Sequence, residues 1–291
     1  MKWEGQERSD NVEDRRGQGG GGTPRMGIGG RGIGLGTIAI ALVAGWIFGI
    51  NPLTVLSLLS GGGEPVVQQQ APAGAARKPP AEDRAAAFVS VVLRDTEVVW
   101  GKLFKAAGST YQAPRLVLFR GATPTACGTG DSAMGPFYCP GDTQVYIDLD
   151  FFDTLSQRMG APGDFAQAYV VAHEVGHHVQ NLMGITGKVD ALRARQSPGQ
   201  ANAMSVRVEL QADCLAGVWA FHSQQGKGWL ERGDVEEAMN AAAQIGDDTL
   251  QRNARGRVVP ESFTHGSSAQ RVSWFQRGLQ SGNVGQCNAM E

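Results

Sequence analysis

Apolar residues recur at helical spacing in the middle of the chain, between residues 164 and 183. The apolar positions are three or four residues apart: Phe165, Ala168, Val171, Val175, Val179 and Leu182. This spacing places them on one face of a helix. Asp164 is a candidate N-cap after Pro162 and Gly163, and Gly184 is a typical helix terminator. The pattern predicts a buried helix over residues 164–183.

Apart from this helix, the chain after residue 80 contains candidate strands followed by further helices. Two short runs have the composition of strands, residues 115–120 and 144–150. Helical spacing recurs in four further stretches: residues 81–107, 201–225, 234–252 and 268–279. Strands that precede a run of helices predict an α+β fold that is mainly helical.

A long uncharged stretch stands apart from these elements near the N-terminus. No charged residue occurs from Gly32 to Gly63, and the stretch can supply the roughly 20 apolar residues that cross a membrane as a helix. Arg25 and Arg31 precede it, so the positive-inside rule places the N-terminus in the cytoplasm. We therefore predict a transmembrane signal anchor. A cleaved signal peptide is the alternative, although the preceding tail is long for one.

This anchor implies a single-pass protein of the inner (cytoplasmic) membrane with its folded domain extracytoplasmic, or periplasmic. The predicted parts are a disordered cytoplasmic Gly-rich tail (1–31), the anchor (32–59), a linker (60–80) and a folded domain (81–291). Gly45 and Gly49 form a GxxxG pattern, which suggests weak homo-association through the transmembrane helix. The formal net charge of -2 and pI near 6.2 give no sign of nucleic-acid binding.

The predicted helix of residues 164–183 carries His173-Glu174-Val175-Gly176-His177. Histidines four residues apart lie on one helix face and can bind one Zn²⁺ together, while the glutamate beside them acts as general base. The alternative is a chance match in a surface helix. This helix is apolar, however, and two buried imidazoles are costly without a partner such as a bound cation. The segment predicts one catalytic zinc ion.

A catalytic zinc site usually has three protein ligands and a water, so a third ligand is needed. Gln180 and Met183 occupy the positions where metzincins have glycine and histidine, which excludes that class. Glu209 and Asp213 share one face of a later, mostly apolar helix. We predict Glu209 as the third ligand, with Asp213 accepting a hydrogen bond from His173 and so fixing its ring. Two solvated surface acids are the alternative.

The remaining histidines are less distinctive. His265 precedes the last predicted helix and is a candidate hydrogen-bond donor to the oxyanion of a tetrahedral intermediate; a loop histidine is the alternative. His178 faces away from His177 on the helix. We read His178 as structural, and His222 as a packing or surface residue.

Four cysteines fit an extracytoplasmic domain. Cys127 and Cys139 bracket a Gly-rich loop and are candidates for one disulfide, which leaves Cys214 and Cys287 for a second. A four-cysteine structural zinc site is the competing reading, but no CxxC spacing supports it.

Three segments carry a resemblance to a known family: HEVGHHVQ, ELQADCLAG and THGSSAQRVSWF. The chain resembles the bacterial putative neutral zinc metallopeptidase family over nearly its whole length, and its ExxxD spacing and Thr-His pair are similar to membrane-associated gluzincins. The resemblance implies a zincin-like metallopeptidase domain, with His173, His177 and Glu209 as zinc ligands and Glu174 as catalytic base. It implies supporting roles for Asp213 and His265. Gly266 departs from the related gluzincins, which commonly have proline after the histidine.

These features predict a membrane-anchored zinc metallopeptidase that hydrolyses peptide bonds of a peptide or protein substrate. Extended substrates commonly pair with an edge strand in HExxH peptidases, and we favour residues 144–149 for this strand over residues 115–120. Two other functions remain open. One is a membrane-anchored binding or scaffold protein with structural zinc. The other is a zinc amidase that acts on cell-envelope peptides.

Overall fold

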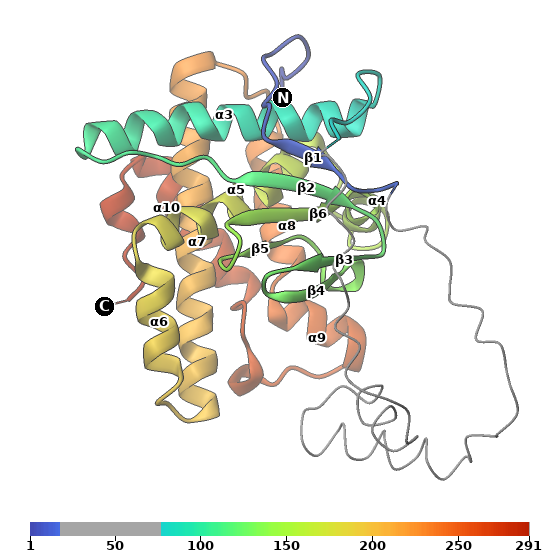
Figure 1. The fold of residues 1–291 in the computed structure, drawn as a ribbon. Helices are drawn as coiled ribbons and strands as arrows, with labels where there is room; N and C mark the ends of the chain where they lie inside the picture. Colours follow the sequence, from blue (N-terminus) through green and yellow to red (C-terminus); the bar gives the residue numbers. More distant parts are fainter. Residues whose placement is uncertain (18–76, 291) are drawn as a thin grey trace, which may run out of the picture. The chain divides into compact units, whose positions relative to one another are not determined.

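The structure, a computed structural model, describes residues 1–17 and 77–290. It contains a four-stranded sheet beside a larger set of helices (Figure 1). The strands are β1 (Val12–Asp14), β2 (Arg115–Phe119), β3 (Ala122–Thr125), β4 (Gly128–Asp131), β5 (Phe137–Cys139) and β6 (Gln144–Asp148). The helices are α3 (Arg84–Ala106), α4 (Asp150–Gln157), α5 (Asp164–Leu182), α6 (Ile185–Arg193), α7 (Pro198–Lys227), α8 (Asp234–Gln244), α9 (Asp247–Arg255) and α10 (Ser268–Ser281). The expected mainly helical α+β fold is confirmed.

The sheet has the strand order β1-β2-β6-β5, while β3 and β4 form a separate hairpin. Strands β1, β2 and β6 are parallel, and β5 runs antiparallel to β6. Strand β2 is a continuous apolar run because both faces of the sheet are covered. Leu116 and Leu118 belong to the main core with the helices, whereas Val117 and Phe119 belong to a smaller cluster with β5 and β6. This alternation follows from the two-residue period of a strand.

The strand order corrects the prediction for substrate pairing. Strand β6, which we favoured, lies between β2 and β5 and is paired on both sides. The edge strands of this sheet are β1 and β5 instead. Pairing order depends on contacts between distant segments, which the apolar pattern of one strand does not encode.

The first residues of the chain are not the disordered tail that we predicted. Strand β1 pairs with β2, with Val12 opposite Leu116. The Asp14 amide donates to the carbonyl oxygen of Arg77 at 2.7 Å, and Arg16 forms an ion pair with Asp83 at 2.7 Å. Residues 1–17 are therefore part of the folded domain.

The remainder of the predicted tail, the predicted anchor at 32–59 and most of the linker lie outside the described residues. Within residues 1–17 and 77–290, none of the helices is both long enough and apolar enough to cross a membrane. The predicted membrane association therefore stays a prediction.

Helix α5 confirms the central sequence prediction, with one correction at its start. Gly163 is the N-cap residue, and Asp164 is the first helical residue rather than the cap. The Asp164 carboxylate accepts a hydrogen bond from the Met1 ammonium at 2.8 Å. An acid in the first turn is also favoured by the helix dipole. Gly184, with φ of 71°, follows the helix end as predicted.

Glycines set how closely the central helices approach. At Gly176 in α5, a Cβ atom would lie 3.0 Å from the Ala212 carbonyl oxygen of α7. At Gly278 in α10, a Cβ atom would lie 1.9 Å from the Cys214 carbonyl oxygen. Larger residues would push these helices apart. The turn of α5 that contains His173 and His177 therefore packs closely against the turn of α7 that contains Glu209. Helix α10 packs closely against another side of α7.

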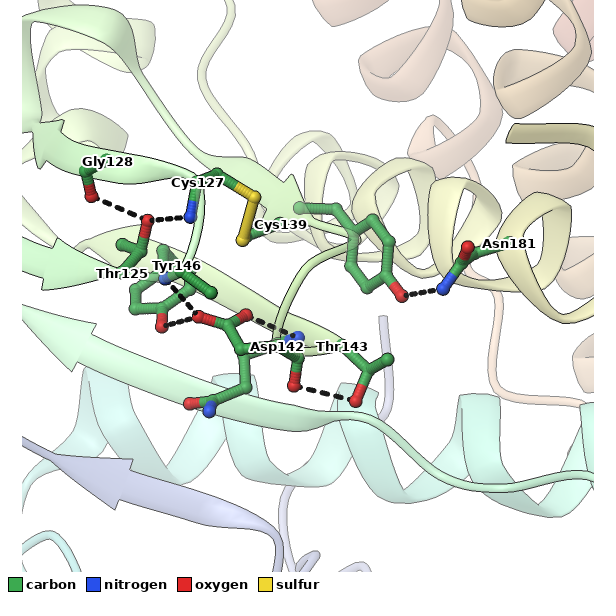
Figure 2. The surroundings of a disulfide bond; sticks show 11 residues. Thr125, Cys127, Gly128, Cys139, Asp142, Thr143, Tyr146 and Asn181 are labelled. Carbon is green, nitrogen blue, oxygen red and sulfur yellow. Dashed lines mark hydrogen bonds between the residues drawn. A yellow bond between two sulfur atoms is a disulfide. The ribbon is translucent and has the colours of Figure 1, made fainter. Parts of the chain in front are cut away.

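Both predicted disulfides are present. Cys127–Cys139 ties the β3–β4 turn to the edge strand β5, and Figure 2 shows it close to the Asp142–Tyr146 hydrogen bond. Cys214–Cys287 ties the C-terminal segment to α7. The second bond closes a sequence separation of 73 residues, so it restricts a large part of the unfolded chain.

Candidate metal centre

Three side chains from α5 and α7 converge at the crossing of these helices. The Nε2 atom of His173 lies 3.2 Å from Oε2 of Glu209, and Nε2 of His177 lies 3.5 Å from Oε1 of Glu209. Ligand atoms of all three residues lie within 4.8 Å of one another. Tetrahedral zinc with bonds of about 2.0–2.1 Å would hold its ligand atoms about 3.3–3.4 Å apart. These residues therefore fit a zinc ion.

The charges at the centre also fit a cation. Burial alone would raise the pKa of Glu209, but the charges of His177 and His173 and their hydrogen bonds hold it well below its usual range. Burial alone would lower the pKa of His173, but Asp213 and Glu209 raise it to about 10. The carboxylates thus require positive charge between them. Imidazolium protons supply it in the metal-free chain, and a divalent cation can replace them.

Glu174 lies in the same turn of α5 and is buried. Burial raises the pKa of its carboxyl group, while the charges of His173 and His177 oppose this rise. A raised pKa suits a carboxylate that accepts and then returns a proton near neutral pH.

Asp213 is fully buried and accepts the hydrogen bond that we predicted. Its Oδ1 lies 2.8 Å from Nδ1 of His173. Two further partners of Asp213 were not predicted from the sequence, Arg271 of α10 and Tyr169 of α5. Arg271 donates to both carboxylate oxygens at 2.9 Å, and the Tyr169 hydroxyl donates to Oδ1. A buried carboxylate is stable only when paired in this way.

His265 lines the same cleft as His173, Glu174 and Glu209. The structure adds a partner that we did not predict. The Oδ2 atom of Asp247 accepts the backbone amides of Thr264, His265 and Gly266 at 2.6–3.1 Å, and its Oδ1 lies 3.1 Å from Nδ1 of His265. The predicted helix of residues 234–252 is interrupted at Gly246, which places Asp247 at the start of α9 beside this loop.

The backbone conformation at Gly266 explains why this chain lacks the proline that related gluzincins commonly have after the histidine. Its φ of +93° lies in the left-handed region, whereas proline is fixed near −65°. This loop therefore cannot accept proline at residue 266.

The centre opens into a cleft of about 1060 Å³. Residues 132–138, which run into the edge strand β5, form one wall, and α6 and α9 contribute to others. The volume exceeds that of most small-molecule sites, so the cleft can hold several residues of an extended chain.

The other two histidines lie away from the centre, as we predicted. His178 contacts the carbonyl oxygen of Gln112 at 2.6 Å and the hydroxyl of Tyr138 at 3.0 Å. It thereby joins α5 to β5. His222 lies 2.8 Å from the carbonyl oxygen of Gly282 and packs α7 against the end of α10.

Comparisons with known proteins agree with this chemistry. The chain is 53% identical over 294 residues to the uncharacterized protein YpfJ of Escherichia coli K12, covering 99% of this chain and 98% of that protein. It is 45% identical over 202 residues to the uncharacterized protein Rv2575 of Mycobacterium tuberculosis H37Rv, covering 66% of each. No solved structure matches it. The family model described as "Putative neutral zinc metallopeptidase" matches residues 1–290. The chain therefore belongs to the putative neutral zinc metallopeptidase family.

Proposed function

We propose that this protein hydrolyses peptide bonds with one zinc ion held by His173, His177 and Glu209. The observation that carries the proposal is the position of Glu174, a buried carboxylate in the ligand turn that lines the cleft with these three side chains. Zinc bound here would polarise the scissile carbonyl and lower the pKa of a bound water to about 7.

The side chains around the centre take the remaining roles. Glu174 removes a proton from the attacking water and returns it to the leaving amine. His265 is held through Nδ1 by Asp247, and this bond raises the pKa of the ring and so favours the imidazolium form, whose Nε2–H can donate to the oxyanion of the tetrahedral intermediate. Asp213 keeps Nδ1 of His173 protonated, which leaves Nε2 as the ligand atom.

Strand β5 is the candidate site of substrate pairing. It is paired with β6 on one side, and none of the described strands is paired with its other side. Phe137 and Tyr138 of this strand line the cleft. An extended peptide can add to such an edge through main-chain hydrogen bonds.

We also propose an extracytoplasmic location for the domain. Two disulfides support it, because such bonds persist mainly in oxidising compartments.

The test is Glu174→Gln, which keeps the shape of the side chain but removes the base. We expect zinc to be retained at one ion per chain and hydrolysis of a peptide library to fall by a factor of roughly 10²–10⁴. Unchanged hydrolysis would contradict the role of Glu174. Parallel assays on cell-wall peptide fragments separate a peptidase from an amidase, and zinc binding without hydrolysis of either substrate indicates a structural zinc.

A further inference from the structure

The second histidine of the motif has an outer hydrogen-bond partner that none of the roles above uses. The Nδ1 atom of His177 lies 2.9 Å from Oε1 of Gln180, one helical turn further along α5. When His177 binds a metal through Nε2, its proton must be on Nδ1. Gln180 must then present its oxygen, not its amino group, to the ring.

The contacts of Gln180 fix this orientation. Its Nε2 donates to the carbonyl oxygen of Val208 at 2.7 Å and to Oε1 of Gln211 at 3.0 Å. A backbone carbonyl can only accept, so the amino group of Gln180 must face α7. The oxygen is therefore directed at His177.

The next residue in the chain of hydrogen bonds is fixed in the same way. Nε2 of Gln211 donates to the carbonyl oxygen of Cys287 at 2.9 Å, which directs its Oε1 at Gln180. Cys287 is held against α7 by its disulfide with Cys214. Gln180, Gln211 and Cys287 are each no more than 5% exposed, so bulk water cannot replace these partners.

We propose that Gln180 and Gln211 are positioning residues that keep His177 in its metal-binding tautomer. Donation runs in one direction, from the imidazole to Gln180, from Gln180 to Gln211, and from Gln211 to the carbonyl of Cys287. A reversed Gln180 would point its amino group at Nδ1, favour a proton on Nε2 and block the ligand atom. The proposal rests on the proposed zinc site, and it assigns the Cys214–Cys287 disulfide the role of anchoring the last acceptor.

The experiment compares zinc affinity in three variants of the full chain. Gln180→Met and Gln211→Met keep side-chain volume but remove the amides. Gln276→Met is the matched control, because Gln276 is a partly buried glutamine of α10 whose amide contacts Met239 instead. Each zinc-loaded protein is titrated with a chromophoric chelator, and each zinc-free protein is unfolded in urea.

We expect Gln180→Met to lose zinc affinity by a factor of roughly 10–100, the usual effect of removing an outer partner of a metal ligand. Gln211→Met should lose affinity by a smaller factor, although it touches no ligand. Gln276→Met should bind zinc as the unmodified chain does. A merely structural role would lower stability of the zinc-free form without this selective loss.

Equal zinc affinity in the unmodified chain and Gln180→Met overturns the proposal while leaving the zinc site intact. If Gln180→Met does not fold, Gln211→Met decides instead. It removes one of the two acceptors that orient Gln180 and touches no ligand, so unchanged affinity overturns the proposal. Failure of the unmodified chain to bind zinc overturns the proposed function together with this inference.

Discussion

The two histidines of the candidate centre are held by different physical means. His173 is bonded to a carboxylate, and that carboxylate is neutralised by Arg271 and bonded by Tyr169. His177 is bonded to a neutral amide, and the hydrogen bonds continue through a second amide to a backbone carbonyl. We call His173 with its bonded partners the charged side of the centre, and His177 with its bonded amides the amide side.

The two sides differ in the kind of interaction that stabilises them. The charged side depends on strong interactions between buried ions, so removal of one partner leaves an uncompensated charge. The amide side depends on orientation, because each bond alone contributes only about 1 kcal/mol. We therefore expect changes on the charged side to affect folding first, and changes on the amide side to affect metal binding first.

The most severe test of this contrast is Arg271→Met. It leaves the Asp213 carboxylate buried with less positive charge, which should lower the free energy of unfolding by about 3–5 kcal/mol. Urea unfolding of the zinc-free protein measures this change. Arg277→Met is the control, because Arg277 lies on the same helix but is exposed and stacks on Trp274. A loss below about 1 kcal/mol for Arg271→Met would remove the distinction between the two sides.

The double variant Cys214→Ser/Cys287→Ser tests the anchor of the amide side. It should lower the free energy of unfolding by about 2–5 kcal/mol through the lost cross-link and also weaken zinc binding several-fold. Cys127→Ser/Cys139→Ser removes a disulfide that does not contact this chain of amides, so it should lower stability alone. The measurements are urea unfolding and chelator competition. Equal zinc affinity in both double variants would show that the anchor is not coupled to His177.

The smallest expected effect concerns the His265 loop, which belongs to neither side. The hydrogen bond to Asp247 raises the pKa of His265 above 6.5, against the effect of burial. Burial would raise the pKa of Asp247, but the bonds from the His265 ring and backbone hold it below 3.8. The His265 contribution is complete below pH 6.5 and is lost as pH rises through the raised pKa. The Asp247 contribution is present above pH 3.8 and is lost as pH falls through the lowered pKa.

The pair should therefore stabilise the folded state most between pH 3.8 and 6.5. His265 is half exposed, so the contribution should be about 1 kcal/mol or less. Thermal unfolding of Asp247→Asn across this pH range should show a smaller pH dependence than the unmodified chain. Asp190→Asn, at an exposed position of α6, should leave the pH dependence unchanged, and equal curves for both variants would contradict the expected pairing.

The sequence predicted the parts of the centre that lie within one helix. His173 and His177 share a helix face, and so do Glu209 and Asp213, so local spacing is enough to group each pair. The convergence of these two helices on one metal site was predicted as well, but Tyr169 of α5 and Arg271 of α10 were missed as partners of Asp213. Arg271 in an amphipathic helix has the same local pattern as a surface charge. Its role depends on the close approach of α10 to α7, which the sequence does not display locally.

Strand β1 was missed for a related reason. Its residues include Glu13 and Asp14, and acids are depleted in strands. Glu13 is buried here because Arg15 and Arg115 pair with it at 2.7 and 3.0 Å. Arg115 lies on the neighbouring strand, about a hundred positions further along the chain. From sequence alone, a charged segment whose ion-pair partner lies so far along the chain cannot be told from an exposed terminal tail.

The pairing of β1 with β2 also joins the two described parts of the chain. The Asp14 amide donates to the carbonyl oxygen of Arg77, and strand β1 covers one edge of β2. A shortened protein that begins at residue 77 would therefore lose a strand of the sheet and expose the backbone groups of β2 to other chains.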